Sequence, residues 1–261
     1  TIMENIIDVK EDGSFRMNMD YFSYMNEKKM FNDNFSSLFG YPARNEESDL
    51  SKHYLDVAAS IQKVTEYTLL KIIKNIKNSY NSKNLVLAGG VALNCVANGK
   101  ILKENLFDNI WIQPAAGDAG SSVGSALLAY YSYFNNKRIK VNEFDSMKSS
   151  RLGPKYSVHE IKAYLKKIDA PYHENKNYSS TSKKVAKIIS EGKIVGLFQG
   201  RMEFGPRALG SRSILGDPRD ENTQSKMNLK IKYRESFRPF APIVMHDKSS
   251  EYFDIKGESK Y

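Results

Sequence analysis

The chain has 261 residues, of which 41% are hydrophobic, and it carries a formal net charge of +9. This length can bury real hydrophobic cores and suits one or two domains. No apolar run has the length of a bilayer span and no basic-then-apolar leader is seen, so we expect a soluble, cytoplasmic protein without a membrane anchor. The only cysteine, Cys95, excludes an intrachain disulfide and a cysteine-rich metal site, and we interpret it as a small buried residue.

The predicted elements of the first part alternate between helices and strands. Apolar residues recur at helical spacing over 49–79, which predicts a long amphipathic helix. A short apolar strand, 84–88, ends in the glycine pair Gly89 and Gly90 and precedes a helical segment, 91–104. This order of strand, tight turn and helix is the first half of an α/β layer.

The next unit repeats the same order, with a strand at 109–112, a turn at 114–122 and a helix at 123–133. Two such units imply an α/β fold with a mostly parallel sheet. Open α/β sheets bind ligands at the carboxyl ends of their strands, and glycine-rich turns at helix starts suit phosphate, although neither turn matches an established nucleotide motif. Asp118, between two glycines, could hold a metal ion or a ligand hydroxyl, or could cap the helix.

Residues 134–155 are polar and rich in turn formers, so we place a domain boundary near residue 150. Beyond it we predict a helix at 180–191, capped by serine or threonine, and strands at 194–198 and 243–245. The chain has no initiator methionine and stops soon after the last of these strands. We therefore expect a fragment of a longer protein.

The positive charge lies in the second part of the chain. Residues 1–150 carry 17 Lys and Arg against 17 Asp and Glu, whereas residues 151–261 carry 22 against 13. A localised positive field attracts anionic partners such as phosphate metabolites, nucleic acid or membrane headgroups. The lysines of the helix-like segments are interpreted as solvated faces, which leaves the arginines as the better candidates for a site.

Two clusters of basic residues are candidates for an anion site. The first, 200–215, holds three arginines and three glycines directly after the strand at 194–198. Arginine presents forked donors that match phosphate or carboxylate, and glycine lets the backbone approach closely. The second comprises Lys232, Arg234 and Arg238. The two clusters could converge on one phosphate-bearing ligand; the alternative is a basic surface loop.

Four segments together resemble a known family of enzymes. They are Leu-Ala-Gly-Gly-Val-Ala-Leu-Asn at 87–94, Gln-Pro-Ala-Ala-Gly-Asp-Ala-Gly-Ser-Ser-Val-Gly-Ser-Ala at 113–126, Leu-Gly-Pro-Lys-Tyr-Ser at 152–157, and the arginine-rich cluster at 200–215. In this order they resemble the O-carbamoyltransferases of nodulation-factor and antibiotic biosynthesis. The resemblance implies two modules, both truncated: the C-terminal lobe of an actin/hexokinase-type ATPase fold at 1–150, and a YrdC-like α/β domain at 151–261.

In that family the YrdC-like module joins carbamoyl phosphate and ATP into carbamoyl adenylate, releasing diphosphate, and the other module transfers the carbamoyl group to a hydroxyl of a small-molecule acceptor. The resemblance implies that the following residues bind carbamoyl phosphate and the ATP phosphates: Arg201, Arg207, Arg212, Lys232, Arg234 and Arg238. It places the nucleotide against Gly89, Gly90, Asn94, Gly120 and Ser121. Asp118 would be a ligand of a divalent metal, whether magnesium, iron or zinc.

The chain departs from the family at both ends. The family's paired-histidine metal motif is absent, and the four histidines are scattered and interpreted as surface or satisfied core residues: His53, His159, His173 and His246. The YrdC-like module also lacks its C-terminal part. We therefore expect the isolated chain to transfer carbamoyl groups poorly or not at all.

Other functions compete with this interpretation. A nucleic-acid-binding module would use the basic second part, where Tyr233, Phe237 and Phe240 alternate with basic residues, but arginines in glycine turns and a neutral first part argue against nucleic acid. tRNA threonylcarbamoylation combines the same two module types, although the cluster at 200–215 favours O-carbamoyl transfer. Carbamoyl transfer in hydrogenase maturation would need cysteine-rich zinc segments, which a chain with one cysteine lacks.

Overall fold

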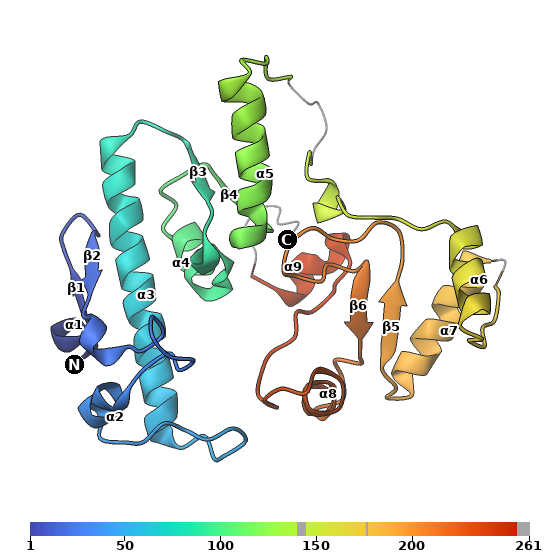
Figure 1. Cartoon of the computed structure of the whole chain (residues 1–261), viewed down its shortest axis with the longest axis horizontal. Coiled ribbons are helices and arrows are strands. Elements are labelled where there is room, and N and C mark those ends of the chain that lie inside the picture. Colours follow the sequence, from blue (N-terminus) through green and yellow to red (C-terminus); the bar gives the residue numbers. More distant parts are fainter. Residues whose placement is uncertain (140–144, 176, 255–261) are drawn as a thin grey trace. The chain divides into compact units, whose positions relative to one another are not determined.

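The computed structural model describes residues 1–139, 145–175 and 177–254. The chain forms two compact units, Thr1–Gln113 and Pro114–Tyr261, and each combines helices with short strands (Figure 1). The predicted α/β class is confirmed in this general sense, but the predicted mostly parallel sheet is not: of the three two-stranded sheets described, one is parallel and two are antiparallel. The units divide earlier in the chain than residue 150, where composition places a boundary between family domains, and that boundary stays a prediction.

Unit 1 is built around one long helix. Its elements in chain order are α1 (Ile2–Asn5), β1 (Ile7–Val9), β2 (Phe15–Met17), a 3-10 turn (Met19–Tyr21), α2 (Asp33–Phe39), α3 (Lys52–Ser79), β3 (Asn84–Leu87), a second 3-10 turn (Gly90–Leu93), α4 (Cys95–Lys103) and β4 (Asn109–Ile112). Strands β1 and β2 pair antiparallel, whereas β3 and β4 pair parallel. The long helix and the predicted strand, helix and strand that follow it are confirmed.

Helices α3 and α4 cover one face of the β3–β4 pair. The buried cluster between them consists of Ile73, Leu85, Ile101 and Phe107. Ile73 and Ile101 are 1% and 2% exposed, and burying such a side chain contributes roughly 1.5–3 kcal/mol. Val86 and Trp111, which are paired in register, lie on the opposite face and are exposed. Among the described residues, the core of unit 1 therefore packs against one face of the β3–β4 pair, the face that α3 and α4 cover.

Cys95 is exposed, so its interpretation as a buried residue is wrong. It begins α4, whose buried positions are Ala97 and Ile101. These two residues are four apart and share one face of the helix, and Cys95 lies off that face.

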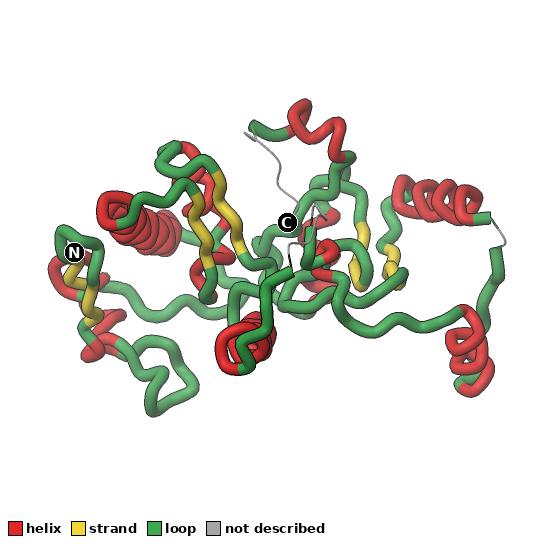
Figure 2. The backbone as a smooth tube through the Cα atoms, turned by 90° about the horizontal axis from the view of Figure 1, so that it is seen from above, coloured by secondary structure: helices red, strands yellow, loops and turns green. Residues whose placement is uncertain are grey.

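Unit 2 has shorter elements joined by long loops. In chain order they are α5 (Asp118–Leu128), a π-helical turn (Ala129–Tyr133), a 3-10 turn (Lys148–Ser150), α6 (Val158–Lys167), α7 (Tyr178–Ser190), β5 (Val195–Phe198), β6 (Arg212–Leu215), α8 (Thr223–Met227), a second π-helical turn (Asn228–Lys232), another 3-10 turn (His246–Lys248) and α9 (Ser249–Tyr252). Strands β5 and β6 pair antiparallel. Most of residues 199–211 and 233–245 is loop (Figure 2). None of the described helices is long and apolar enough to cross a membrane.

Three predictions for unit 2 need correction. Helix α5 begins at Asp118 rather than near residue 123, because the helix accommodates the glycines that we read as a turn. Helix α7 is capped by Asn177, whose side chain accepts from the backbone of Ser179, and not by serine or threonine. The predicted strand at 243–245 is not formed, because this apolar run finds no pairing partner among the described residues.

Candidate functional site

The loop between β5 and β6, residues 199–211, carries Arg201 and Arg207 of the first arginine cluster, and we call it the arginine–glycine loop; Arg212, the third arginine, begins β6. Its base is closed by Gln199, which donates its backbone N–H to Ser211 O at 3.0 Å and its Nε2 to Gly210 O at 2.8 Å. All three of its glycines adopt positive φ angles, which side-chain-bearing residues rarely do: Gly200 (57°), Gly205 (119°) and Gly210 (95°). Gly205 and Gly210 thus take backbone angles that strongly favour glycine, whereas the angle at Gly200 is one that other residues adopt at modest cost.

Glu203 is the buried centre of this loop, with 6% of its surface exposed. Its Oε1 accepts the backbone N–H groups of Leu209 at 2.8 Å and Ser211 at 2.6 Å, and both oxygens accept that of Arg212. Burial raises the pKa of the Glu203 carboxyl, but the backbone donors outweigh it and the pKa lies below its usual value. Glu203 was not among the site residues predicted from the sequence, although it is the one acidic residue among three arginines.

A second segment, residues 150–154, runs beside the loop and is hydrogen-bonded to it. Ser150 is fully buried; its carbonyl accepts the Phe204 N–H at 2.6 Å, and its Oγ donates to Phe204 O at 2.6 Å. Gly153 donates its N–H to Met202 O at 2.9 Å, and a Cβ at Gly153 would lie only 2.8 Å from that oxygen. Two of the four family-like segments, 152–157 and 200–215, are therefore joined by hydrogen bonds.

The turn that precedes α5 also contacts the arginine–glycine loop. Ala115 is 0% exposed, and a Cβ placed on Gly205 would lie 2.9 Å from the Ala115 Cβ. Real Cβ atoms do not approach so closely, so glycine at 205 permits this contact. A third family-like segment, 113–126, thus packs against the segment 200–215 within unit 2.

The three arginines of the first cluster differ in what their guanidinium groups contact. Arg201 Nη1 donates to Gly153 O at 3.0 Å. Arg212 Nη1 donates to a backbone carbonyl at 2.8 Å, and its guanidinium lies 3.5 Å from the centre of the Phe198 ring, a cation–π contact. Arg207 is exposed and forms no hydrogen bond or ion pair with any residue that the structure describes. Arg201 and Arg212 hold the loop, whereas Arg207 is available to an external anion.

The second cluster lies on residues 228–238, which fold around one buried side chain. Asn228 is 0% exposed. Its Nδ2 donates to the carbonyl oxygens of Ser236 at 3.0 Å and Arg238 at 2.7 Å, and its Oδ1 accepts from Arg234 Nε at 2.6 Å. We call this segment the Asn228 loop. The burial of Asn228, like that of Glu203, was not predicted from the sequence, because a single asparagine forms no pattern that indicates burial.

The cations of the Asn228 loop also divide into held and available groups. Arg234 lies 4.9 Å from the centre of the Phe240 ring in addition to its bond with Asn228. Arg238 forms an ion pair with Glu235 at 3.2 Å. Lys232 is exposed and has no hydrogen-bonding or ionic partner in the described part of the chain. The convergence of both clusters on one ligand stays a prediction.

Replacing Asn228 by aspartate is expected to weaken unit 2 although the two side chains have the same shape. Aspartate keeps the acceptor for Arg234 but turns an oxygen, in place of the amide donor, toward two carbonyl oxygens. We expect a loss of about 1–3 kcal/mol, as for Asn228→Ala, because buried acceptors lose their donor. Hydrogen exchange of peptides spanning 224–238 measures it, with Asn175→Asp, an exposed site, as control. An Asn228→Asp variant as stable as this control would contradict the donor role.

Asp217 follows β6 and forms a forked ion pair with Arg219, whose Nε and Nη2 donate at 2.9 and 2.6 Å. These bonds and a backbone N–H lower the pKa of Asp217 from 3.8 to about 2. A carboxyl with a depressed folded-state pKa stabilises the fold above its unfolded-state pKa, and this contribution is lost as the pH falls from 3.8 to about 2.

We therefore expect Asp217→Asn to lower the thermal midpoint at neutral pH and to narrow that gap to wild type as the pH falls through this window. Thermal unfolding at a series of pH values measures the gap. Asp247→Asn, an exposed aspartate, is the control. A gap of constant size down to about pH 2 would show that the ion pair does not have this effect.

The glycine pair that the sequence places against a nucleotide lies in unit 1, after β3. Gly89 has a φ of 98°, and no atom lies within 4 Å of a Cβ built on Gly89 or Gly90. Packing in the described structure thus leaves the space beside both glycines open. The predicted contact with a nucleotide is compatible with this geometry and stays a prediction.

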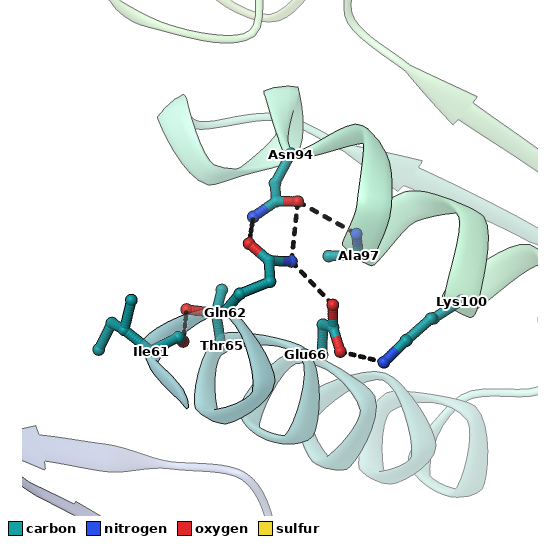
Figure 3. Close-up of polar contacts among 7 residues, drawn as sticks. All are labelled: Ile61, Gln62, Thr65, Glu66, Asn94, Ala97 and Lys100. Carbon is teal, nitrogen blue, oxygen red and sulfur yellow. Dashed lines mark hydrogen bonds and ion pairs between the residues drawn. The ribbon is translucent and has the colours of Figure 1, made fainter. Parts of the chain in front are cut away.

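Asn94 belongs to a polar network that joins α3 to α4 (Figure 3). Its Oδ1 accepts the Ala97 N–H at 3.1 Å and so caps α4, and its amide exchanges two hydrogen bonds with Gln62, at 2.9 and 3.2 Å. Gln62 also donates to Glu66, which is buried and paired with Lys100. The bond from Lys100, and secondly that from Gln62, lower the pKa of the Glu66 carboxyl. This network is a structural reason for Asn94, and its role toward a nucleotide is a prediction.

Asp118, the predicted metal ligand, is exposed at the first position of α5. Gly117 is the capping residue of this helix and no side chain caps it, so the alternative that Asp118 is the cap is wrong. Gly120 and Ser121 lie in the first turn. Among the described residues, no group of three or more His, Cys, Asp or Glu side chains could hold a metal ion. The described residues therefore do not by themselves fit a metal site.

Comparison with known proteins assigns both ends of the chain to one class, the carbamoyltransferases. Residues 1–127 match the family model of the carbamoyltransferase N-terminus, and residues 186–261 match that of the carbamoyltransferase C-terminus. The chain therefore belongs to the carbamoyltransferase family, which confirms the resemblance seen in its four segments. The boundary predicted near residue 150 lies in the stretch between the two matched regions.

Individual relatives are much longer than this chain. It is 52% identical over 265 residues to an uncharacterised protein of Synechocystis sp., covering all of this chain and 42% of that protein. It is 36% identical to the nodulation protein NolO of Bradyrhizobium diazoefficiens, over 78% of this chain and 36% of the relative. It is 32% identical to the nodulation protein U of Sinorhizobium fredii, over 76% and 33%. The chain spans less than half the length of these curated relatives.

Proposed function

We propose that this chain is part of an O-carbamoyltransferase that uses carbamoyl phosphate and ATP to carbamoylate a hydroxyl of a small molecule such as a sugar, a nodulation factor or an antibiotic. Membership of the carbamoyltransferase family supports the transferred group. Similarity to nodulation proteins supports a small-molecule acceptor. The observation that carries the proposal is Arg207, an exposed guanidinium without a described partner on a loop whose neighbouring arginines, Arg201 and Arg212, are held by backbone carbonyls.

The proposed reaction has two steps. In the first, carbamoyl phosphate, ATP and a water give carbamoyl adenylate, phosphate and diphosphate. In the second, the acceptor hydroxyl attacks the carbamoyl carbon and AMP leaves, while the hydroxyl proton is lost to a base. Every phosphate species in the first step is an anion, so the protein's task is to position these groups and to balance their charge.

The basic residues of unit 2 divide this task. Arg207 and Lys232 contact the phosphate oxygens of carbamoyl phosphate and ATP, because their charged groups have no described partner. The other four are held by the protein and contribute a fixed positive field: Arg201, Arg212, Arg234 and Arg238. Preorganised charge of this kind costs no reorganisation when the adenylate forms.

The remaining assignments concern the modules, nucleotide and metal. Residues 1–150 would be the C-terminal lobe of an actin/hexokinase-type domain, and residues 151–261 part of a YrdC-like domain. Backbone groups of the glycine turns at 89–90 and 120–121 would approach a nucleotide. Asp118 would offer one carboxylate to a divalent metal, whose other ligands would come from outside the described residues. We assign no step of the reaction to that metal.

Exchange of labelled diphosphate into ATP tests the proposal, with the full-length protein that contains this chain. Exchange that requires carbamoyl phosphate supports adenylate formation. Exchange that instead requires threonine and bicarbonate would favour tRNA threonylcarbamoylation. Absent exchange together with tight, steeply salt-dependent binding of single-stranded nucleic acid would favour a nucleic-acid-binding module.

A further inference from the structure

We propose that Glu203 is a positioning residue for the anion site: its buried carboxylate is an internal counter-ion that folds the arginine–glycine loop, so that phosphate is recognised by the Arg207 side chain and not by the backbone N–H groups of residues 209–212. This inference rests on the proposed function, because it concerns how the same site takes its anionic substrate. The evidence for it is the set of hydrogen bonds inside the loop and the Arg207 guanidinium, which takes part in none of them.

The backbone donors of the loop's second half are already used inside the protein. Phosphate-binding glycine loops normally turn successive N–H groups toward the ligand. Here the N–H groups of Leu209, Ser211 and Arg212 point at the Glu203 carboxylate. The N–H of Gly210, between them, donates to Ser213 Oγ at 2.9 Å. Four consecutive donors, at residues 209–212, are thus withdrawn from any external anion.

Arg207 is held in place by anchors on both sides. Two residues before it, Gly205 packs against the buried Ala115. Two residues after it, Leu209 is bound by the Glu203 carboxylate at 2.8 Å. The backbone at Arg207 is therefore fixed, while its side chain remains exposed and without a described partner. Removing the Glu203 carboxylate releases the second anchor and lets Arg207 move.

The sign of the effect separates positioning from simple electrostatics. Glu203 is a negative charge among arginines, so if it acted only through its field, removing it would strengthen anion binding. If it positions Arg207, removing it weakens binding instead. A glutamine at position 203 separates positioning from the effect of the charge. Its Oε1 can still accept the N–H groups of Leu209 and Ser211, while the negative charge is gone.

The test measures diphosphate binding by titration calorimetry in the full-length protein and its Glu203→Ala and Glu203→Gln variants. Glu221→Gln is the matched control, since Glu221 is an exposed acid of the same unit. We expect the dissociation constant to rise about tenfold in Glu203→Ala, to rise less in Glu203→Gln, and to stay unchanged in the control. Hydrogen exchange should accelerate at residues 204–212 and not in β5 of the alanine variant.

Equal or tighter diphosphate binding in a folded Glu203→Ala variant would overturn the inference, because that substitution removes the carboxylate anchor. If Glu203→Ala unfolds unit 2, the glutamine variant decides: tighter diphosphate binding there would show that Glu203 acts through its charge and would overturn the inference, whereas weaker binding would support it. The proposed reaction can fail separately: wild-type protein that binds diphosphate, loses affinity in the Glu203 variants, and yet catalyses no exchange would refute the adenylate chemistry and support the positioning role.

Discussion

Replacing Arg207 by alanine is expected to reduce carbamoyl-phosphate-dependent exchange of diphosphate into ATP by about 100-fold or more. Loss of one preorganised donor at a site of developing charge typically costs about 10²–10³ in rate. The Arg207 guanidinium is exposed and has no partner among the described residues, so its removal leaves no protein group unsatisfied. The loss should therefore appear as lower activity with hydrogen exchange of the loop unchanged.

Two further variants make the Arg207 result specific. Arg138→Ala removes the same charge from unit 2 at a residue that lies 4.8 Å from the Tyr131 ring and outside both arginine clusters, and should keep wild-type activity. Arg207→Lys keeps the charge but loses the planar fork, and should fall between wild type and alanine. Wild-type exchange in Arg207→Ala would show that another cation, with Lys232 the next candidate, contacts the phosphates.

Periodic patterns predicted the fold where packing follows the local sequence. The apolar spacing before residue 80 indicated α3, and the short apolar runs indicated β3 and β4, because these elements bury one face against each other. The same rule wrongly predicted a strand at 243–245, since an apolar run forms a strand only if a partner edge is available. Strand β6 was missed because its sequence, with Arg212 at its start, lies inside the arginine-rich cluster.

Composition predicted the candidate site better than it predicted the residues that build it. Clustered arginines and glycines identified the arginine–glycine loop, and the structure adds that only Arg207 of its arginines is available. Glu203 and Asn228 were missed because their importance comes from burial and from the many bonds each makes. A hub of this kind depends on tertiary structure, since a single polar residue has no period in the sequence.

Replacing Gly205 by alanine is expected to destabilise unit 2 by about 3 kcal/mol, whereas Gly200→Ala in the same loop should cost about 1 kcal/mol. Both glycines have positive φ, 119° and 57°. The Gly200 angle is one that other residues can adopt at modest cost, and no atom lies within 4 Å of a Cβ there. At Gly205 the angle is less accessible, and the new Cβ would meet that of Ala115 at 2.9 Å. Ala115 is fully buried and cannot move aside, so overpacking adds to the backbone strain.

Hydrogen exchange of peptides from β5 and β6 gives both free energies, and diphosphate exchange into ATP gives the consequence for the site. Because the contact at Gly205 is one of the two anchors beside Arg207, Gly205→Ala should lose activity even where it remains folded, and Gly200→Ala should not. Equal destabilisation by the two substitutions would mean that Gly205 does not pack against Ala115. The turn before α5 would then have no part in positioning Arg207, and Glu203 would be the sole anchor of the loop.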